Sequence, residues 1–381
     1  MSKLISRDML PMVDLKGQYA NLQNEILSGF QEVLEKTQFI NGPAVKDFAS
    51  HLSEYLGVKY TIPCGNGTDA LQIALMSLGL RPGDEVITTP FTFVATAEVI
   101  GLLGLVPVFV DVDPETFLLD VTKLESKITP KTKCVIPVHL FGQCVDMESL
   151  LAICNKHDLR IVEDNAQAIG AEIKFSDGSV RKAGTIGDLG TTSFFPSKNL
   201  GCYGDGGAIF TNSDVYGDLV RMVVNHGSSK KYYHDVIGVN SRLDTLQAIV
   251  LNAKLPHLDK YNKARQAVAA FYNEKFKGLE SIQTPRFTDW SSHVFHQYTL
   301  KLNGVDRSSF MDYLKAAGIS TAVYYPVPLH VQKGYKGSGY TEGDFPVSEE
   351  LSKTVISLPI HTEMDTDKLE YITSKVIEYF N

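Results

Sequence analysis

Residues 60–80 read YTIPCGNGTDALQIALMSLGL, and this stretch decides the fold. A short apolar strand at 60–64 runs into a glycine turn, and the residues from Ala70 onward have the all-round apolar character of a buried helix that ends at Gly79. A strand, a glycine turn and a helix in this order point backbone N–H groups and a helix N-terminus at an anion. The stretch therefore predicts one unit of an α/β sheet with an anion site at its turn.

Strands and helices alternate downstream of this unit. Such alternation implies right-handed crossovers and a largely parallel sheet with helices on both faces. Beyond residue 163 two strands follow without a long helix between them, so we expect a partly antiparallel arrangement there. The predicted strands are 86–89, 106–112, 134–139, 160–163, 190–195 and 207–211, and the predicted helices between them are 95–103, 121–128 and 147–157.

The two ends of the chain frame this sheet. Helices are predicted upstream at 14–35 and 45–56, and downstream at 243–255 and 258–277, with Pro256 between the last two. We predict a large domain over 1–255 and a smaller C-terminal α+β domain over 256–381. The smaller domain is expected to contain strands at 296–302 and 319–324 and helices at 307–317 and 366–380.

Composition limits the classes of function. The 381 residues are 44% hydrophobic and 21% charged, as in an ordinary soluble globular protein, and the net charge of −8 argues against nucleic acid as a partner. No apolar run approaches a membrane span, and residues 1–8 do not lead into a signal-peptide core, so we expect a cytoplasmic protein without a membrane partner. Five cysteines without C-x-x-C spacing predict reduced thiols, and no metal site is expected.

Residues 192–207, TSFFPSKNLGCYGDGG, place Lys198 between an aromatic–serine run and a glycine-rich turn. A desolvated lysine loses proton affinity and becomes a nucleophilic amine that can form a Schiff base. A single lysine in a loop is more often a surface residue. Its meaning therefore depends on the residues predicted to lie near it.

The parts of a pyridoxal phosphate site occur at the ends of predicted strands. Such a site needs a carboxylate at the pyridine nitrogen, a Schiff-base lysine, a phosphate cradle and a flat side chain against the ring. The chain offers Asp164, Lys198, the turn 67–69 with Ser193, and Phe93 in these roles. A strand-terminal acid alone is as often a helix N-cap. The four parts together point to a site at the carboxyl edge of the sheet.

A dinucleotide site is the competing interpretation of the glycine turn. Residues 65–70 fit the pattern G-x-G-x-x-A, which predicts NAD(P) binding when an acidic residue ends the next strand. The next strand ends in TTPFTF at 88–93, and Asp84 and Glu85 come at its start. An NAD-dependent oxidoreductase is therefore disfavoured, and the turn more plausibly holds a single phosphate.

Seven segments spread over almost the whole chain resemble the DegT/StrS-type sugar-nucleotide aminotransferases. The resemblance implies fold type I of the pyridoxal phosphate-dependent transferases, the fold of aspartate aminotransferases, with a mainly parallel mixed sheet between helices. The segments that carry it are GNGTDAL at 65–71, PFTFVAT at 90–96, EDNAQ at 163–167, SFFPSK at 193–198, GDGGA at 204–208, GVNSRL at 238–243 and YPVPLH at 325–330.

This resemblance implies a role for each matching residue. Lys198 would form the internal aldimine with pyridoxal 5'-phosphate and later move a proton between cofactor and substrate, and Asp164 would pair with the pyridine nitrogen. Asn240 would reach the phosphate from the partner subunit, which makes the site a property of a homodimer. The other implied cofactor contacts are Gly67, Thr68, Asp69 and Ser193 at the phosphate, Phe93 on the ring and Gln167 near the 3-hydroxyl.

The same resemblance implies L-glutamate as the usual donor and a keto-sugar nucleotide as the acceptor. Residues 238–244 look like the branch that aminates C3. The segments 194–198 and 201–207 look close to enzymes for UDP-linked 2-acetamido-3-oxo-hexuronic acids, which implies the synthesis of O-antigen-type lipopolysaccharide sugars. Arg242 could pair with the substrate carboxylate or form a structural salt bridge, and Tyr325 and His330 are candidate sugar contacts. A 3- or 4-aminotransferase for a dTDP-, UDP- or GDP-linked keto-deoxysugar remains the alternative. Deoxygenation is disfavoured, because that branch carries histidine in place of the lysine.

Overall fold

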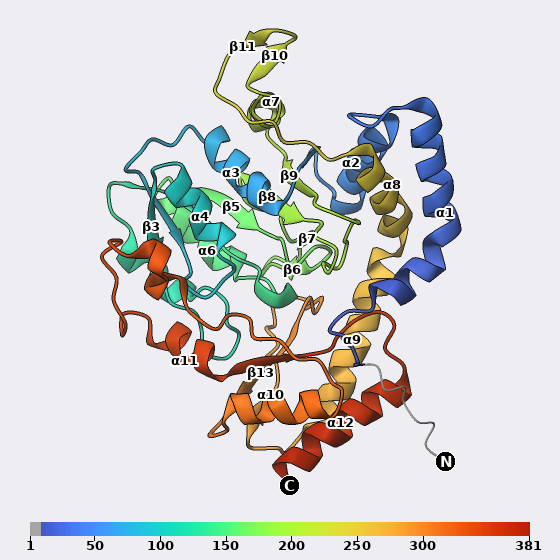
Figure 1. Ribbon diagram of the computed structural model, residues 1–381. Coiled ribbons are helices and arrows are strands. Elements are labelled where there is room, and N and C mark those ends of the chain that lie inside the picture. The colour runs from blue at the N-terminus through green and yellow to red at the C-terminus, as the bar shows by residue number, and fades with distance from the viewer. Residues whose placement is uncertain (1–8) are drawn as a thin grey trace.

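The computed structural model describes residues 9–381, and its centre is a seven-stranded mixed sheet (Figure 1). The strand order is β1-β9-β8-β5-β4-β2-β3, with β5 (Arg160–Asp164) in the middle. From β8 to β3 the neighbours pair in parallel, whereas β9 pairs antiparallel with β8 and β1. This confirms the mainly parallel sheet with an antiparallel part. The other strands are β1 (Tyr60–Cys64), β2 (Glu85–Thr88), β3 (Val106–Phe109), β4 (Thr132–Val135), β8 (Leu189–Ser193) and β9 (Gly207–Thr211).

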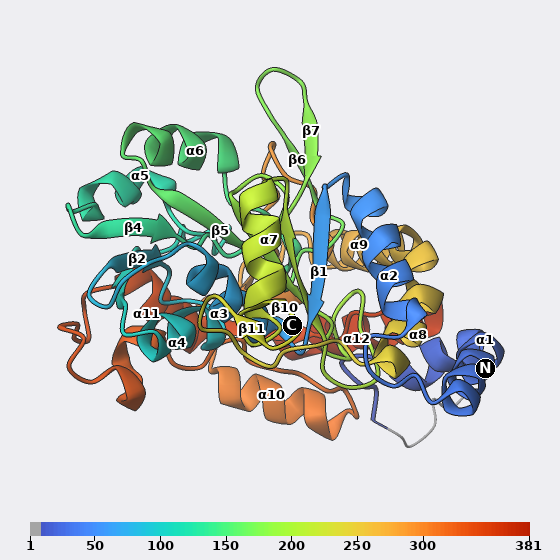
Figure 2. The same cartoon turned by 90° about the horizontal axis from the view of Figure 1, so that it is seen from above.

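Helices cover both faces of this sheet, because the buried strands are apolar on both sides (Figure 2). Successive strand residues enter different cores: Val86 packs with the cluster under α3, α4 and α7, and Ile87 packs with the cluster under α5 and α6. At the β1 end of the sheet, α2 and α8 pack together, and α1 packs on α8. The helices are α1 (Leu15–Lys36), α2 (Pro43–Leu56), α3 (Gly67–Ser77), α4 (Ala95–Leu102), α5 (Val121–Leu124), α6 (Met147–Lys156), α7 (Asp214–Val223) and α8 (Thr245–Lys254).

The C-terminal part contains a separate antiparallel sheet of β12, β13 and β14, seen in the lower half of Figure 1. Its hydrophobic cluster is built mainly from residues 268–376 and also includes Leu10 from the N-terminal end. The boundary between 255 and 256 remains a prediction. The elements are α9 (Leu258–Lys275), β12 (Ile282–Gln283), β13 (Tyr298–Leu302), α10 (Arg307–Ala316), α11 (Pro346–Thr354), β14 (Val355–Leu358) and α12 (Thr366–Phe380).

The predicted strand at 319–324 is wrong. Only two isolated bridges form there, from Ile319 to Leu10 and from Ala322 to Ser357. The chain then leaves the edge of β14, and Tyr324 and Tyr325 line a cavity instead of extending the sheet. The apolar residues of this segment pack into two clusters, Ile319 in the C-terminal cluster and Val323 against the cluster under α5 and α6.

Two short hairpins were not predicted. One joins β6 (Glu172–Lys174) to β7 (Val180–Lys182), and the other joins β10 (Ser228–Lys230) to β11 (Tyr233–His234). The second hairpin stands out from the body of the molecule beyond α7 (Figure 1). The five cysteines are free and buried, and none of the helices within residues 9–381 could cross a bilayer.

Candidate active site

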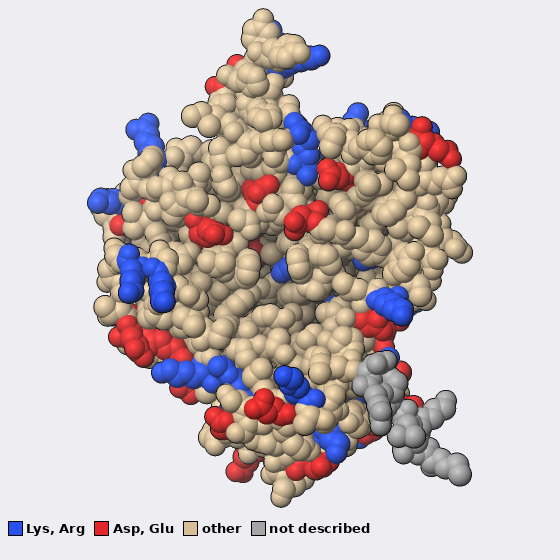
Figure 3. All heavy atoms as spheres, in the orientation of Figure 1, with Lys and Arg blue, Asp and Glu red and all other residues tan. Residues whose placement is uncertain are grey.

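A cavity of about 610 Å³ opens at the carboxyl edge of the central sheet. The face drawn in Figure 3 is hollowed near its centre, and acidic and basic side chains are scattered around the hollow. Most of the sequence-predicted site residues line this one cavity, and four of them do not: Asp69, Asn240, Arg242 and His330. The predicted residues in its wall are Gly67, Thr68, Phe93, Asp164, Gln167, Ser193, Lys198 and Tyr325.

The N-terminus of α3 forms one end of the cavity. The helix begins at Gly67, earlier than predicted, because the side chain of Asn66 caps it by accepting a hydrogen bond from the Asp69 N–H at 2.8 Å. A Cβ atom on Gly67 would lie 2.7 Å from Cβ of Ser193, so only glycine lets this helix end approach Ser193 so closely. Backbone N–H groups of the helix and the hydroxyls of Thr68 and Ser193 thus converge on a site suited to an anion.

Asp69 lies outside the cavity wall and faces the segment that follows β11. Its Oδ2 accepts a hydrogen bond from the Ser241 hydroxyl at 2.5 Å, and the same hydroxyl accepts from the Gly65 N–H at 2.8 Å. A carboxylate would also repel a phosphate at close range. The structure therefore places Asp69 as a link between the glycine turn and Ser241.

Asp164 ends β5 and points into the cavity. Its side chain is 6% exposed, and its oxygens accept hydrogen bonds from the Thr96 hydroxyl at 2.8 Å and the Ala166 N–H at 3.1 Å. A fixed carboxylate thus faces the cavity from the centre of the sheet.

Lys198 enters the cavity from the loop between β8 and β9. Its side chain opens into the cavity yet lies deep within the protein, and this burial lowers its pKa to about 8, against the opposing effect of Asp164. The loop is tight: a Cβ atom on Gly201 would lie 2.3 Å from the Pro196 carbonyl oxygen, and the Lys198 N–H donates to the Phe195 carbonyl at 2.8 Å. The tight loop thereby holds the Lys198 amine, with its lowered pKa, near the carboxyl group of Asp164.

A chain of hydrogen bonds forms another wall. The amide of Gln167 accepts from the Phe141 N–H at 2.8 Å and donates to the Tyr325 hydroxyl at 3.0 Å. Burial raises the pKa of Tyr325, which therefore stays a neutral phenol. Phe93 is 53% exposed and lies with its ring centroid 6.3 Å from that of Tyr325, so a flat apolar face borders the cavity.

Three polar residues from the C-terminal part of the chain also line the cavity and were missed from the sequence: His296, Gln297 and Tyr324. Burial, together with the nearby Lys198 and Arg265, holds the pKa of His296 well below its usual range. This imidazole is therefore neutral at physiological pH. These three residues follow neither a glycine turn nor the end of a parallel strand, and those were the two signals used to predict site residues from the sequence.

The remaining predicted contacts lie elsewhere. Asn240 is exposed, and its side chain accepts a hydrogen bond from the Arg242 guanidinium. Within residues 9–381 Arg242 has no carboxylate partner, so the structural salt bridge considered from the sequence is absent there. His330 is buried against Phe345, with Nε2 3.0 Å from the carboxylate of Glu349. Its side chain thus takes part in packing behind the cavity.

A model of the DegT/DnrJ/EryC1/StrS aminotransferase family matches residues 20–377. Three relatives are similar over nearly their full lengths. The chain is 45% identical to the pleiotropic regulatory protein of Geobacillus stearothermophilus, covering 97% of this chain and 98% of the relative. It is 45% identical to the UDP-2-acetamido-2-deoxy-3-oxo-D-glucuronate aminotransferase of Pseudomonas aeruginosa (96% and 98%). It is 43% identical to a UDP-N-acetyl-3-dehydro-α-D-glucosamine 3-aminotransferase of Acidithiobacillus ferrooxidans (96% and 97%).

Solved structures agree with this match. DesV of S. venezuelae superposes with a TM-score of 0.94 at 36% identity, covering 98% of this chain and 99% of that one. NtdA of Bacillus subtilis, solved with bound cofactor PMP, superposes with a TM-score of 0.91 at 30% identity, covering 100% and 87%. The expected transferase fold is thereby confirmed.

Proposed function

The chain belongs to the DegT/DnrJ/EryC1/StrS aminotransferase family, and we propose that it transfers an amino group from L-glutamate to C3 of a UDP-linked 2-acetamido-3-oxo-hexuronic acid. Members of this family use pyridoxal 5'-phosphate. We assign the reaction to the cytoplasmic synthesis of O-antigen-type lipopolysaccharide sugars. The observation that carries the proposal is that Lys198 and Asp164 face one cavity with an anion site at its end.

The residues present fit this cofactor. The N-terminus of α3 with Thr68 and Ser193 would hold the phosphate, since helix N–H groups and hydroxyls are donors for an anion. Asp164 would hold a proton on the pyridine nitrogen, and the Lys198 amine would bind the aldehyde carbon covalently. The exposed face of Phe93 would lie against the ring, and Gln167 would contact the 3-hydroxyl.

The chemistry then divides between the cofactor and the chain. When bound, pyridoxal 5'-phosphate supplies an electron sink and a carrier for the amino group. Lys198 Nζ would move a proton from the donor carbon to the cofactor in the first half-reaction and from the cofactor to C3 of the acceptor in the second. An amine with a pKa of about 8 can both accept and give a proton near neutral pH. Tyr325 and Gln167 would keep the reacting groups in place.

The rate of covalent cofactor attachment to cofactor-free protein is expected to rise with pH and to level off above pH 8. Only the neutral amine is a nucleophile, and burial lowers the pKa of Lys198 to about 8. Below that value each pH unit should change the rate about tenfold. Stopped-flow absorbance after mixing protein with the cofactor measures the rate. A rate that still climbs tenfold per unit between pH 9 and 10 would show an ordinary lysine.

We propose that the working enzyme is a homodimer with shared sites. Asn240 and Arg242 lie outside the cavity of their own subunit, and Asn240 is exposed. Asn240 of the partner subunit would complete the phosphate site, and its neighbour Arg242 would reach the sugar. Large exposed apolar side chains support an interface, among them Ile40 (55% exposed) and Ile237 (87%).

Arg242 should set the preference for an acidic sugar. It has no carboxylate partner within residues 9–381, so its guanidinium is available to a substrate carboxylate. Arg242→Met is expected to lower kcat/KM for the UDP-linked 3-keto-hexuronic acid by about 30-fold, since a charged hydrogen bond contributes about 1.5–3 kcal/mol. The neutral 3-keto-hexosamine nucleotide should lose less than about threefold.

Turnover of both nucleotides, and of dTDP-linked 3-keto and 4-keto deoxysugars, measures this preference. Lys231→Met is the matched control, since Lys231 is an exposed cation in the turn between β10 and β11. Parent protein that favours a 4-keto sugar would overturn the C3 assignment, and equal losses on the acidic and neutral sugars would remove Arg242 from carboxylate recognition. Absence of turnover on every sugar would favour a regulatory protein.

A further inference from the structure

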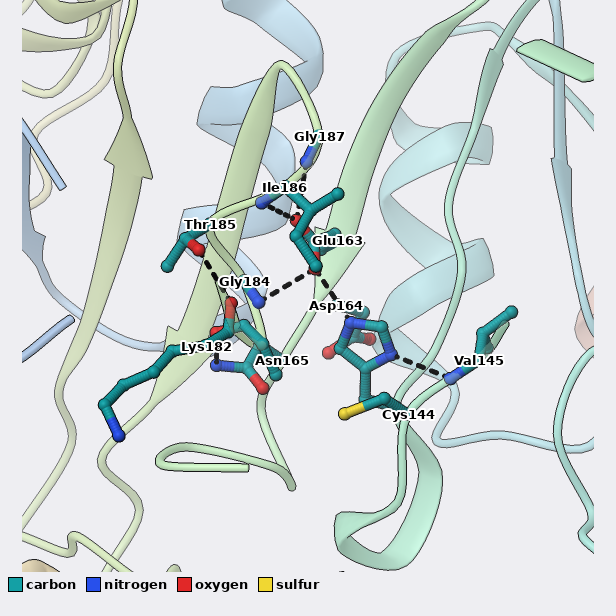
Figure 4. A network of polar contacts seen from close by, with 12 residues as sticks. Cys144, Val145, Glu163, Asp164, Asn165, Lys182, Gly184, Thr185, Ile186 and Gly187 are labelled. Carbon is teal, nitrogen blue, oxygen red and sulfur yellow. Dashed lines mark hydrogen bonds and ion pairs between the residues drawn. The ribbon is translucent and has the colours of Figure 1, made fainter. Parts of the chain in front are cut away.

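A fully buried carboxylate lies directly behind Asp164. Glu163 precedes Asp164 on β5, and because successive strand residues point to opposite faces, its side chain points away from the cavity. Its Oε1 accepts hydrogen bonds from the Ile186 N–H at 2.6 Å and the Gly187 N–H at 2.7 Å. Its Oε2 accepts from the Gly184 N–H at 2.8 Å (Figure 4). The side chain of Glu163 thus binds three backbone amides of the loop 184–187 and holds this loop next to the end of β5.

The fourth contact of this carboxylate is His139. Its Nε2 lies 2.9 Å from Oε2 of Glu163, and its Nδ1 accepts a hydrogen bond from the Val145 N–H at 3.3 Å. Since Nδ1 is an acceptor, the proton of the ring lies on Nε2 and is donated to Glu163. His139 therefore connects two segments, and like Glu163 it is 0% exposed.

His139 also begins a segment that contacts two residues of the cavity wall. Its N–H donates to the Asp164 carbonyl at 3.0 Å, which fixes the end of β5. Two residues later, the Phe141 N–H donates to the amide of Gln167, and Gln167 donates in turn to the Tyr325 hydroxyl. Hydrogen bonds of His139, together with the short backbone segment that joins it to Phe141, therefore connect Glu163 to Asp164 and Gln167 in the cavity wall.

We propose that Glu163 and His139 are positioning residues for the transamination site, which hold Asp164 and the Gln167 amide in the geometry that binds the cofactor. The inference rests on the proposed function, because it assigns Asp164 and Gln167 to the cofactor. Neither Glu163 nor His139 lines the cavity, so they act through the residues that do. A carboxylate that holds three loop amides and one imidazole has every contact it needs without a ligand.

Two variants of His139 separate its contacts. Glutamine places its amide nitrogen near the position of Nε2 and keeps the donor to Glu163, whereas asparagine keeps only the acceptor near Nδ1. His139→Asn is expected to weaken binding of pyridoxal 5'-phosphate at least about tenfold, because it leaves a buried carboxylate without one donor. His139→Gln should stay within about threefold of the parent. Absorbance titration of folded, cofactor-free protein measures the affinity.

Tyr272→Phe is the matched control. It removes a buried hydrogen bond of 2.9 Å, from the Tyr272 hydroxyl to the Pro359 carbonyl, in the C-terminal cluster. Tm should fall in this variant while the affinity for the cofactor stays that of the parent. A His139→Asn variant that behaves in the same way, losing only Tm, overturns the proposal.

A measurement on the parent protein does not depend on whether a variant folds. Because coupling between two sites is reciprocal, cofactor binding should slow hydrogen exchange at the amides of Gly184, Ile186 and Gly187 at least about fivefold. These amides lie in the loop that leads into β8 and outside the cavity wall. Unchanged exchange there overturns this inference alone. A parent protein that fails to bind the cofactor overturns the proposed function as well.

Discussion

Lys198→Ala is expected to lower kcat/KM for sugar amination at least about a thousandfold. A positioned general acid–base contributes 10²–10⁴ in rate, and this lysine is also the covalent anchor in the proposed site. Burial lowers the pKa of this amine to about 8, although Asp164 opposes the effect. A larger fraction of the amine is therefore neutral and nucleophilic near neutral pH than for an ordinary lysine. Steady-state turnover of the UDP-linked 3-keto sugar with L-glutamate measures the loss.

Lys254 provides the comparison for this variant. It is 1% exposed, burial also lowers its pKa to about 8, and its Nζ donates to the Gly201 carbonyl at 2.7 Å. Lys254→Met should lower Tm but keep the covalent attachment of the cofactor, because this amine does not reach the cavity. If Lys198→Ala protein aminates the sugar at the rate of the parent, the catalytic assignment fails.

Asp164→Asn is expected to lower kcat/KM about a hundredfold, or about 2.7 kcal/mol of transition-state free energy. The amide keeps the size of the side chain but lacks the charge that would hold a proton on the pyridine nitrogen. It would also turn a donor toward the Thr96 hydroxyl or the Ala166 N–H, which now donate to the carboxylate. Turnover measures the loss, and the absorption of the bound cofactor should change with it.

Asp188→Asn is the control for that loss. Asp188 contacts the opposite end of β5, where it accepts a hydrogen bond from the Ile161 N–H at 2.8 Å. This variant should keep the parent's activity within about threefold, since it removes a charge at the edge of the sheet remote from the cavity. Equal losses in both variants would mean that carboxyl groups at both ends of β5 act through stability and that Asp164 has no special role.

The core of the site could be predicted from the sequence for a geometric reason. Phe93, Asp164 and Ser193 each follow or end a strand of the sheet, and Thr68 follows β1. Because the carboxyl ends of these strands meet at one edge, local sequence patterns sufficed to bring them together. Lys198 joined them because its loop begins where β8 ends.

Other residues could not be placed in this way. Asp69 and His330 lie in segments that carry the family resemblance, yet one faces Ser241 and the other packs on Phe345, because a motif fixes sequence distance and not side-chain direction. His296 and Gln297 reach the cavity from the segment before β13, through tertiary packing that leaves no periodic signal. The contact between Glu163 and His139 could not be predicted either, since the two residues are 24 positions apart in the sequence.

Borohydride trapping followed by peptide mapping tests the central claim most directly. Purified protein is loaded with pyridoxal 5'-phosphate, reduced, digested and analysed by mass spectrometry. The expected result is a stable cofactor adduct on Lys198 and none on Lys254, although both amines are buried with a pKa of about 8. An adduct on another lysine, or an unmodified Lys198 in fully loaded protein, would contradict the account.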